Sequence, residues 1–454
     1  MNTLFSASAV VAICVLIASI TSIARANPAC SSLNDQSANL RAMLDVDGVA
    51  EIPAGQTWRV DELELFDNEA ILGKGTICKA ASSTYGLIVK GNNVRIEDVT
   101  FRPEMVSGQP NCDVKLADGS RNVRIESNHF EGNTYSAICG ANDTAVGGQP
   151  HVIPATGIMI NDNTFNGYVR PIFLHSTDNV NIRNNILSNS LRDAIRLREN
   201  DGYVLISGNQ FINVGNGVQS TETQDAIDTQ WSGQRLVITD NIVRGTESIG
   251  FDIKGVSPDS SNLGSRSIII ANNHISDTFF SAIVLHGNLD TGEANFSIIV
   301  ESNIIEGAVR NASFADAAIW AKGAVKYLTI ANNQIRSNKA RGITVQTRSG
   351  QSDGTVAGIH VTGNTLINNG VETAGSSIGL YLLGVHGAIV TGNTIGNDNE
   401  LPNPSTRFGI YATKIVDGIF KNNFLRCNTS SQITVSGTNT IVSDNLQATT
   451  GCTP

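Results

Sequence analysis

After its first 26 residues the sequence lacks any apolar run of the roughly 18 residues that a membrane-spanning helix needs. The apolar run from Ala9 to Ala18 is shorter than that and is followed by the small-residue pattern Ala24-Arg-Ala26. This pattern is typical of a secretory signal cleaved after Ala26, although no Lys or Arg precedes the run. We therefore expect a signal peptide at residues 1–26 and a secreted or periplasmic mature chain without a membrane span.

Positive charge is also scarce. The chain has 31 Lys and Arg against 41 Asp and Glu, which gives a formal net charge of −10. This balance argues against nucleic acid as a partner. The sequence also lacks a Pro- or Ser-rich linker and any shift in composition, so we expect one continuous architecture where the length alone would suggest two or three domains.

No Cys-x-x-Cys pair and no Cys/His cluster with zinc spacing is present, which argues against a zinc site. An even number of cysteines in an exported chain instead predicts disulfides, although six cysteines allow 15 pairings. Proximity favours Cys112 with Cys139 and Cys427 with Cys452. The cysteines of the mature chain are Cys30, Cys78, Cys112, Cys139, Cys427 and Cys452.

A motif of the form apolar, any, apolar, any, any, Asn, any, apolar recurs along the chain, as in Val204-Leu-Ile-Ser-Gly-Asn209-Gln-Phe. Its segments are short and rich in Val, Ile and Thr, which indicates strands joined by turns. A near-regular period of about 30 residues indicates a solenoid. We interpret the repeated Asn as a turn residue that tolerates the left-handed conformation and whose amide bonds to the backbone or to the Asn of the next coil. The repeated residues are Asn128, Asn163, Asn185, Asn209, Asn241, Asn273, Asn303, Asn333, Asn364, Asn393, Asn423 and Asn445.

This coil repeat resembles the right-handed parallel β-helix family of the pectate lyase type, over roughly residues 85 to 447. The resemblance implies an all-β fold, a right-handed parallel β-helix that forms a single-stranded solenoid of roughly a dozen coils. We expect an N-terminal cap at residues 27–84, because an open solenoid end exposes its core, and the β-helix with a C-terminal tail at residues 85–454. The Arg-x-Pro-x-x-Arg signature of pectate lyases and the motif set of β-helix polygalacturonases are absent, so no specific member is identified.

Three further segments can be aligned: Asp193-Ala-Ile-Arg-Leu-Arg198, Asp225-Ala-Ile-Asp-Thr-Gln230 and Ile249-Gly-Phe-Asp-Ile-Lys254. Their strict alternation is typical of strands with one buried face. Stacked strands lie about 4.8 Å apart, so equal positions should form two outward ladders along the solenoid. The first ladder comprises Phe173, Arg196, Asp228, Asp252, Val284, Trp320, Thr344, Tyr381 and Tyr411. The second comprises His175, Arg198, Gln230, Lys254, His286, Lys322 and Gln346.

The second ladder is almost wholly basic or amide in an acidic chain. Like charges on neighbouring strands repel one another, so such a row indicates compensation by anions. We therefore expect an acidic, uronic-acid-containing polysaccharide as partner and substrate, with the aromatic rings as platforms for sugars. The expected substrate-binding residues are His175, Gln230, His286, Trp320, Lys322 and Tyr381.

The favoured chemistry is β-elimination, with Lys254 as a base whose pKa is lowered by cationic neighbours. Arg196 and Arg198 would hold the substrate carboxylate, and Asp228 and Asp252 would act beside them and could bind Ca²⁺. We expect Asp193 and Asp225 to cap the turns that precede their strands.

Two alternatives remain open at this stage. On the same scaffold, Asp228 and Asp252 could serve as the acid and base of a glycoside hydrolase, or act in a C5-epimerase. A third class is a non-catalytic glycan-binding or adhesin-type β-helix, because one architecture hosts unrelated functions.

Overall fold

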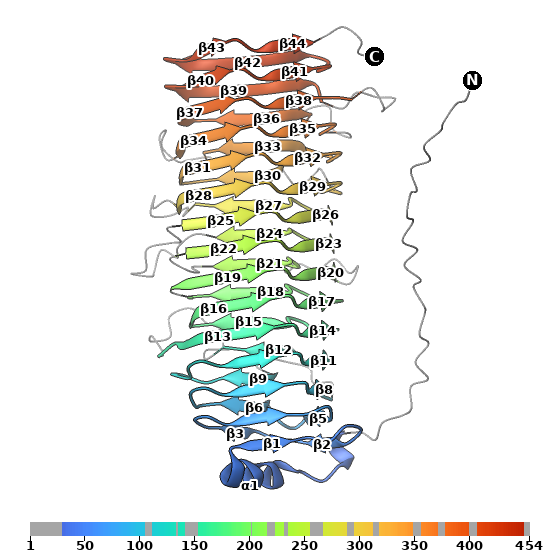
Figure 1. Cartoon of the computed structure of the whole chain (residues 1–454). Helices are drawn as coiled ribbons and strands as arrows, with labels where there is room; N and C mark the ends of the chain where they lie inside the picture. Colours follow the sequence, from blue (N-terminus) through green and yellow to red (C-terminus); the bar gives the residue numbers. More distant parts are fainter. Residues whose placement is uncertain are drawn as a thin grey trace, which may run out of the picture.

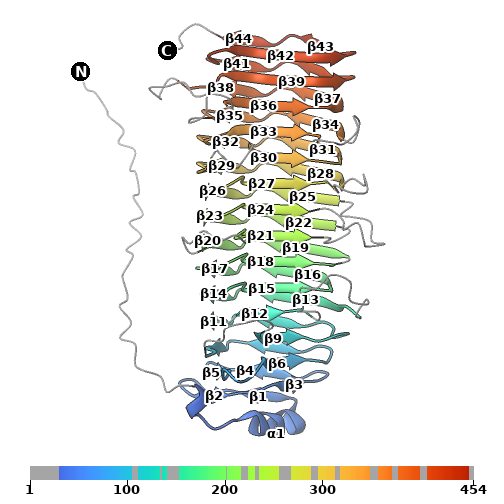
Figure 2. The same cartoon turned by 180° about the vertical axis from the view of Figure 1, so that it is seen from behind.

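The computed structural model describes residues 30–104, 111–132, 135–140, 153–200, 202–215, 223–230, 235–254, 267–287, 295–311, 317–347, 356–370, 377–398 and 406–448. The predicted signal peptide and Cys452 lie outside these residues. Within them the chain winds into a right-handed parallel β-helix, seen from two sides in Figures 1 and 2. No helix in this part of the chain is long and apolar enough to cross a membrane.

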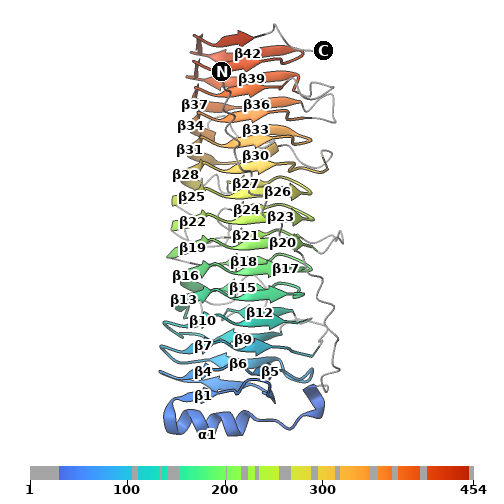
Figure 3. The same ribbon diagram turned by 45° about the vertical axis from the view of Figure 1, so that its right-hand side comes forward.

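Each coil contributes up to three short strands, which stack on the equivalent strands of the coils before and after it (Figure 3). The first strands carry the two predicted ladders. They are β3 (Leu63–Leu65), β6 (Tyr85–Val89), β9 (Cys112–Leu116), β12 (Ser136–Cys139), β15 (Ile172–His175), β18 (Ile195–Arg198), β21 (Ile227–Gln230), β24 (Phe251–Lys254), β27 (Ile283–His286), β30 (Ala317–Lys322), β33 (Arg341–Gln346), β36 (Ile378–Leu383), β39 (Phe408–Val416) and β42 (Ser431–Thr438).

The second strands precede the turn of the repeated Asn and share a 29-stranded sheet with the first strands. They are β1 (Val49–Glu51), β4 (Ala70–Leu72), β7 (Arg95–Glu97), β10 (Arg124–Glu126), β13 (Ala155–Asn161), β16 (Thr177–Arg183), β19 (Tyr203–Ser207), β22 (Arg235–Thr239), β25 (Ser267–Ala271), β28 (Asn295–Glu301), β31 (Val325–Ala331), β34 (Val356–Thr362), β37 (Val385–Thr391), β40 (Ile419–Lys421) and β43 (Ile441–Ser443).

The third strands follow the Asn turn and form a separate 15-stranded sheet. They are β2 (Thr57–Arg59), β5 (Thr76–Cys78), β8 (Thr100–Phe101), β11 (His129–Glu131), β14 (Thr164–Asn166), β17 (Ile186–Ser188), β20 (Gln210–Val214), β23 (Ile242–Thr246), β26 (His274–Thr278), β29 (Ile304–Glu306), β32 (Gln334–Arg336), β35 (Thr365–Ile367), β38 (Thr394–Gly396), β41 (Phe424–Arg426) and β44 (Leu446–Ala448). The sequence predicts roughly a dozen coils. The structure contains further coils, which lie at the N-terminal end, where the Asn motif is absent.

The repeated Asn forms a continuous buried ladder, as predicted. Asn273 illustrates the pattern: its Nδ2 donates to Asn303 Oδ1 at 2.9 Å and to the Ile238 carbonyl at 3.0 Å. Its backbone N–H donates to the same Asn303 oxygen at 3.0 Å. The left-handed conformation belongs to the residue before the ladder Asn, for example Asn272 with φ 56°. The Asn amides therefore satisfy the backbone groups that the turn would otherwise leave unpaired.

The N-terminal end of the solenoid is covered by α1 (Ser37–Asp47), whose Leu40 and Leu44 join the apolar core. Helix α1 ends at Gly48, whose left-handed φ of 68° lets its N–H reach the Leu44 carbonyl. Strand β1 already pairs with β4 in the register of the later coils. The stacking of strands therefore begins before residue 85, within the region that we predict to be the cap.

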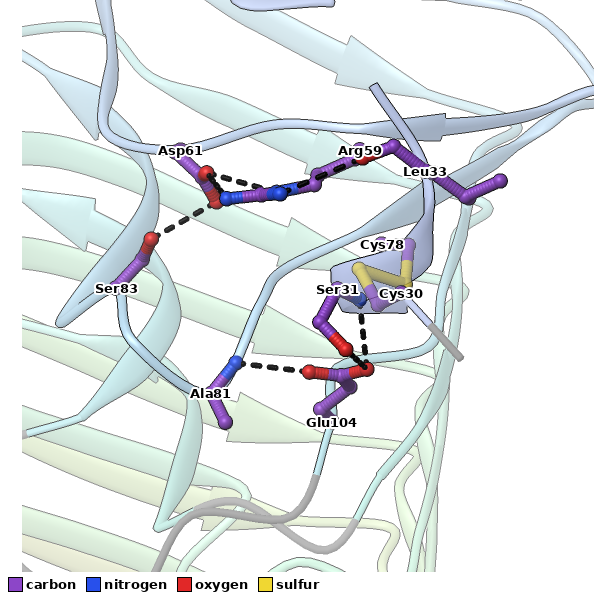
Figure 4. The surroundings of a disulfide bond; sticks show 9 residues. All are labelled: Cys30, Ser31, Leu33, Arg59, Asp61, Cys78, Ala81, Ser83 and Glu104. Atoms are coloured by element: carbon purple, nitrogen blue, oxygen red, sulfur yellow. Dashed lines mark hydrogen bonds and ion pairs between the residues drawn. A yellow bond between two sulfur atoms is a disulfide. The ribbon is translucent and has the colours of Figure 1, made fainter. Parts of the chain in front are cut away.

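Two disulfides lie in the N-terminal third. Cys112 pairs with Cys139, as proximity predicts. Cys30 of the short helix η1 (Cys30–Ser32) pairs with Cys78 of β5 and attaches the segment before α1 to the first coils (Figure 4). Beside it, Glu104 accepts hydrogen bonds from the backbone N–H groups of Ser31 and Ala81. The predicted pairing of Cys427 with Cys452 involves a residue outside the described part of the chain.

Candidate functional site

The two outward ladders have the register that the alternation predicts. Arg196 pairs with Asp228 across β18 and β21, and Asp228 pairs with Asp252 across β21 and β24. In the second ladder Gln230 pairs with Lys254, which pairs with His286 of β27. The six polar side chains at the centre of the predicted site therefore lie on three stacked strands, β18, β21 and β24. They are Arg196, Arg198, Asp228, Gln230, Asp252 and Lys254.

Their exposure differs from the prediction. Asp228 is 1% and Asp252 3% exposed, whereas outward strand positions are expected to face solvent. The reason is local: the side chains of Arg196, Lys254 and His286 approach the two carboxylates within ion-pair distance. These side chains thus form a largely buried network of charges on the outward face of the first strands.

Lys254 connects the two aspartates of this network. Its Nζ lies 2.5 Å from Asp228 Oδ1 and 2.8 Å from Asp252 Oδ2. His286 Nε2 lies 2.7 Å from the other Asp252 oxygen. Asp252 therefore has a cation or imidazole on each oxygen, whereas Asp228 depends mainly on Lys254.

Two further aspartates complete what we call the carboxylate centre, defined as Asp193, Asp225, Asp228 and Asp252. One oxygen each of Asp193, Asp225 and Asp228 lies within 4.8 Å of the others, and all three residues are buried. Asp193 Oδ2 accepts hydrogen bonds from Arg196 Nη1 at 3.0 Å and from Arg170 Nε at 3.1 Å. The centre thus combines four carboxyl groups with three nearby cationic side chains.

Backbone groups fix the two aspartates that precede the strands. Asp193 Oδ1 accepts the N–H of Asp225 at 3.2 Å, and Asp225 Oδ1 accepts the N–H of Ile249 at 2.9 Å. These contacts agree with the predicted capping role, but each cap joins one coil to the next. Within the described residues, Asp225 Oδ2 is buried and has no hydrogen-bond partner.

The surroundings displace the carboxyl pKa values in opposite directions. Burial, together with the Asp193 and Asp252 carboxylates, outweighs Lys254 and Arg196 and raises the pKa of Asp228 to about 6. Burial also opposes ionisation of Asp252, but Lys254 and His286 outweigh it and lower its pKa below the ordinary value. The pKa of Asp225 is raised well above the ordinary range, by burial first and then by Asp252 and Asp193.

The predicted lowering of the Lys254 pKa is wrong. Burial does favour the neutral amine, but the carboxylates of Asp252 and Asp228 outweigh it and raise the pKa. The prediction considered cations two rungs away and omitted the carboxylates that the side chain reaches. Lys254 therefore holds its proton and is unsuited to act as a base.

The donor set does not favour a metal ion. Calcium binds six to eight oxygens at about 2.3–2.6 Å, whereas the Lys254 ammonium already lies between Asp228 and Asp252, the predicted calcium ligands. The trio of Asp193, Asp225 and Asp228 is likewise approached by the Arg170 and Arg196 guanidinium groups and by Lys254. These side chains already supply the positive charge that a dication would bring.

The remaining predicted residues flank the centre along the second ladder. Towards the N-terminus, His175 Nε2 lies 2.9 Å from Glu199, and the Nε of the adjacent Arg198 is buried without a hydrogen-bond partner among the described residues. On the side of the later coils, Lys322 follows His286 in the second ladder. Gln230 occupies the position between Arg198 and Lys254.

The predicted aromatic platforms are arranged differently from what sugar stacking requires. Lys322 Nζ lies 3.7 Å from the centroid of the Trp320 ring and covers one of its faces. Tyr381 stacks on Tyr411 with ring centroids 6.0 Å apart, and Arg341 lies over Tyr381 at 4.3 Å. The ring faces are therefore engaged within the protein, and their role as platforms stays a prediction.

A pocket of about 400 Å³ lies away from this centre, on β7, β10 and β13. Two arginines, two asparagines and a methionine line it: Asn93, Arg95, Asn122, Arg124 and Met159. No carboxyl group, lysine or histidine is among these lining residues, so we place the candidate site at the carboxylate centre.

Sequence reasoning missed the participation of Asp193, Asp225 and Arg170 in the centre. A signal was present, because the three residues occupy the same position before β15, β18 and β21, three residues ahead of the first ladder. Three successive ionisable residues at one position of a coil indicate a shared environment. Interpreting Asp193 and Asp225 only as turn caps left that signal unused.

Comparison with known proteins supports the architecture. Residues 116–297 match the family model for a right-handed beta helix region. The tailspike protein of E. coli bacteriophage HK620, solved with a pentasaccharide, is 13% identical, with a TM-score of 0.51 over 85% of this chain and 76% of that chain. Tailspike protein 3 of bacteriophage CBA120 is 12% identical, with a TM-score of 0.51 over 91% of this chain and 59% of that chain.

The catalytic domain of an α-1,3-glucanase in complex with nigerose is 14% identical, with a TM-score of 0.46 over 93% of this chain and 70% of that chain. A search of curated protein sequences gives no match. At these identities the two tailspike structures support the β-helix fold alone and do not transfer an activity.

Proposed function

We propose that the protein is a glycoside hydrolase that cleaves an acidic polysaccharide in the groove over the carboxylate centre. The observation that carries this proposal is a pair of buried carboxyl groups, Asp228 and Asp252, that contact one Lys254 nitrogen but differ in their second contact. Asp228 has a raised pKa of about 6, whereas the pKa of Asp252 is lowered. Two carboxyl groups driven apart in this way suit an acid and an ionised partner at the same pH.

The roles follow from these protonation states. Asp228 donates its proton to the glycosidic oxygen as the bond from the anomeric carbon to that oxygen breaks, and a carboxylate oxygen of Asp252 bonds to the anomeric carbon. Asp228, now ionised, then takes a proton from the water that displaces Asp252 from that carbon. Each step leaves the number of protons and bonds balanced, and no redox partner is required.

The short separation of the two carboxyl groups favours this nucleophilic route. Both groups contact the same Lys254 nitrogen, at 2.5 and 2.8 Å. The two contacting oxygens therefore lie no farther apart than the sum of these distances, about 5.3 Å. Retaining enzymes hold their carboxyl groups about 5–5.5 Å apart, whereas inverting enzymes leave room for water at about 6.5–9.5 Å. We accordingly propose retention of configuration at the anomeric carbon.

The preference for an acidic polymer rests on donors that line the groove. Within the described residues, the buried Nε atoms of Arg196 and Arg198 and the Nε1 of Trp320 have no hydrogen-bond partner. Buried donors without acceptors are rare in folded proteins, and a ligand rich in carboxylate and hydroxyl oxygens supplies what they lack. A uronate carboxylate also competes for the Lys254 ammonium and thereby uncovers Asp228 and Asp252.

A uronate lyase or C5-epimerase is the second candidate, supported by the protonated state of Lys254. A fixed ammonium beside Arg196 and Arg198 would neutralise the carboxylate next to C5, and ionised Asp252 would then remove the C5 proton. This version reverses the predicted role of Lys254, which becomes a charge partner or proton donor. The products separate the two reactions, because elimination leaves an unsaturated uronate and hydrolysis leaves a saturated one.

The proposal is tested by incubating the protein, Asp228→Asn and Asp252→Asn with uronic-acid polysaccharides and measuring new reducing ends. Loss of a general acid typically costs about 10²–10⁴-fold in rate, so both variants should lose most of the activity. Asp240→Asn, in the exposed turn between β22 and β23, is the matched control and should retain it. Binding without turnover by the unmodified protein would favour a glycan-binding role instead.

A further inference from the structure

Arg196 contacts two carboxylates, those of Asp193 and Asp228, with different geometry. Its Nη1 donates a hydrogen bond to Asp193 Oδ2 at 3.0 Å. Its Nε is 3.4 Å from Asp228 Oδ2, at a geometry that does not form a hydrogen bond. The guanidinium is thus bound to Asp193 and only near Asp228.

Asp193 is itself fixed from two sides. Its Oδ1 accepts the Asp225 N–H of the next coil at 3.2 Å, and its Oδ2 also accepts Arg170 Nε at 3.1 Å. The side chain is buried, and both of its oxygens accept hydrogen bonds from within the protein. Its position relative to Arg196 is therefore set by the backbone of the neighbouring coil.

We propose that Asp193 is a positioning residue that keeps the Arg196 guanidinium from forming an aligned hydrogen bond to Asp228, so that Asp228 keeps the proton that glycosidic cleavage requires. This rests on the proposed function for its purpose, but the arrangement itself can be measured without turnover. Without the Asp193 carboxylate, Arg196 is free to turn its fork of donors onto Asp228, and a bidentate pair strongly favours an ionised carboxylate.

The other charged groups around Asp228 do not replace the effect of Asp193 on Arg196. Lys254 from β24 favours the ionised form of Asp228, while Asp252 on the same strand and Asp193 favour the protonated form. Burial, followed by the Asp252 and Asp193 carboxylates, raises the pKa of Asp225, ahead of β21, well above the ordinary range and so favours its neutral form. Asp193 is thus the one buried carboxylate of the described centre that acts on Asp228 both directly and through Arg196.

The test is a direct titration of the Asp228 carboxyl carbon by NMR in protein labelled at the aspartate side chains, with the resonance assigned from Asp228→Asn. Asp193→Asn preserves the shape and the acceptor for the Asp225 N–H but removes the charge. We expect the pKa of Asp228 to fall by about one unit or more in this variant, the scale on which a nearby charge moves a carboxyl group. Asp225→Asn is the matched control and should leave that pKa in place.

Arg196→Gln separates the two routes by which Asp193 acts. In the Arg196→Gln background, adding Asp193→Asn should produce a clearly smaller fall, because no guanidinium remains to be released. An equal fall in both backgrounds, or an unchanged Asp228 pKa in Asp193→Asn, would overturn the proposal. If Asp193→Asn does not fold, Asp193→Ser, which also keeps an acceptor, gives the same readout. An upheld shift in a protein that cleaves no glycan would reject the proposed function alone.

Discussion

Asp228 and Asp252 are direct neighbours across β21 and β24 and share one lysine nitrogen, yet their carboxyl pKa values move in opposite directions. The difference arises from the second contact of each group. Asp252 has His286 on its other oxygen, whereas the other oxygen of Asp228 has only the poorly aligned Arg196. Two equivalent positions of one ladder thereby become chemically distinct.

The pH dependence of turnover should follow from these two groups. The proposed acid, Asp228, must be protonated, so kcat/KM should fall as the pH rises through about 6. Asp252 must be ionised, so the acidic limb should lie below the ordinary carboxyl range. Initial rates between pH 3 and 9, taken at about 0.1 M ionic strength, would reveal both limbs. A rate that rises through neutral pH would contradict the role of Asp228 as acid.

The pKa shifts of Asp228 and Asp252 should affect the pH dependence of stability in opposite directions. The folded state binds the Asp228 proton more tightly than the unfolded chain does, so this group contributes stability at low pH that is lost between about pH 4 and 6. Asp252 contributes stability above its ordinary pKa that is lost only as the pH falls through its lowered value. The difference in melting temperature between the protein and Asp228→Asn should therefore change across pH 4 to 6. A constant difference would argue against a raised Asp228 pKa.

Replacing Lys254 should destabilise the fold, in contrast to an exposed outward residue. Lys254→Ala leaves Asp228 and Asp252 buried without the ammonium they share, and removal of one partner of a buried charge group costs about 3–5 kcal/mol. The change is measured as the free energy of unfolding in guanidinium chloride. Adding Asp228→Asn to Lys254→Ala should recover part of the loss. A cost below about 0.5 kcal/mol, as for surface sites, would show that the centre is solvated.

The Asn ladder should be most sensitive in its middle. Asn273→Ala removes bonds to Asn303 and Ile238 and leaves buried backbone groups unpaired, at about 1–3 kcal/mol for each unsatisfied group. Asn445 is the last residue of the described ladder and is only partly covered, so Asn445→Ala should cost less. Denaturant midpoints compare the two variants. Equal costs at both positions would mean that the ladder contributes only local turns.

The strand register was accessible from sequence because it depends on period and on residue type, which repeat. The alternation in Asp225-Ala-Ile-Asp-Thr-Gln230 places Asp228 and Gln230 on one face without any knowledge of tertiary contacts. The Asn period likewise follows from the local needs of a turn that recurs in each coil. These features hold for each coil separately and for its immediate neighbours.

The protonation states and the burial of the site were not accessible in the same way. They depend on where long side chains turn: Lys254 towards two aspartates, and Arg196 towards Asp193. Alternation shows that a side chain points outward but does not show whether neighbouring side chains cover it. The pKa of Lys254 was mispredicted for this reason, since its nearest charges are the carboxylates of Asp228 and Asp252 on the other ladder.

The most direct measurement of the central claim follows the products released from uronic-acid polysaccharides by the unmodified protein and by Asp228→Asn. New reducing ends and the ultraviolet absorbance of unsaturated uronates are recorded on the same samples, and the anomeric configuration of the first product is read by proton NMR. The account predicts reducing ends without absorbance, retained configuration, and loss of both signals in Asp228→Asn. Products that absorb in the ultraviolet, or full activity in Asp228→Asn, would contradict it.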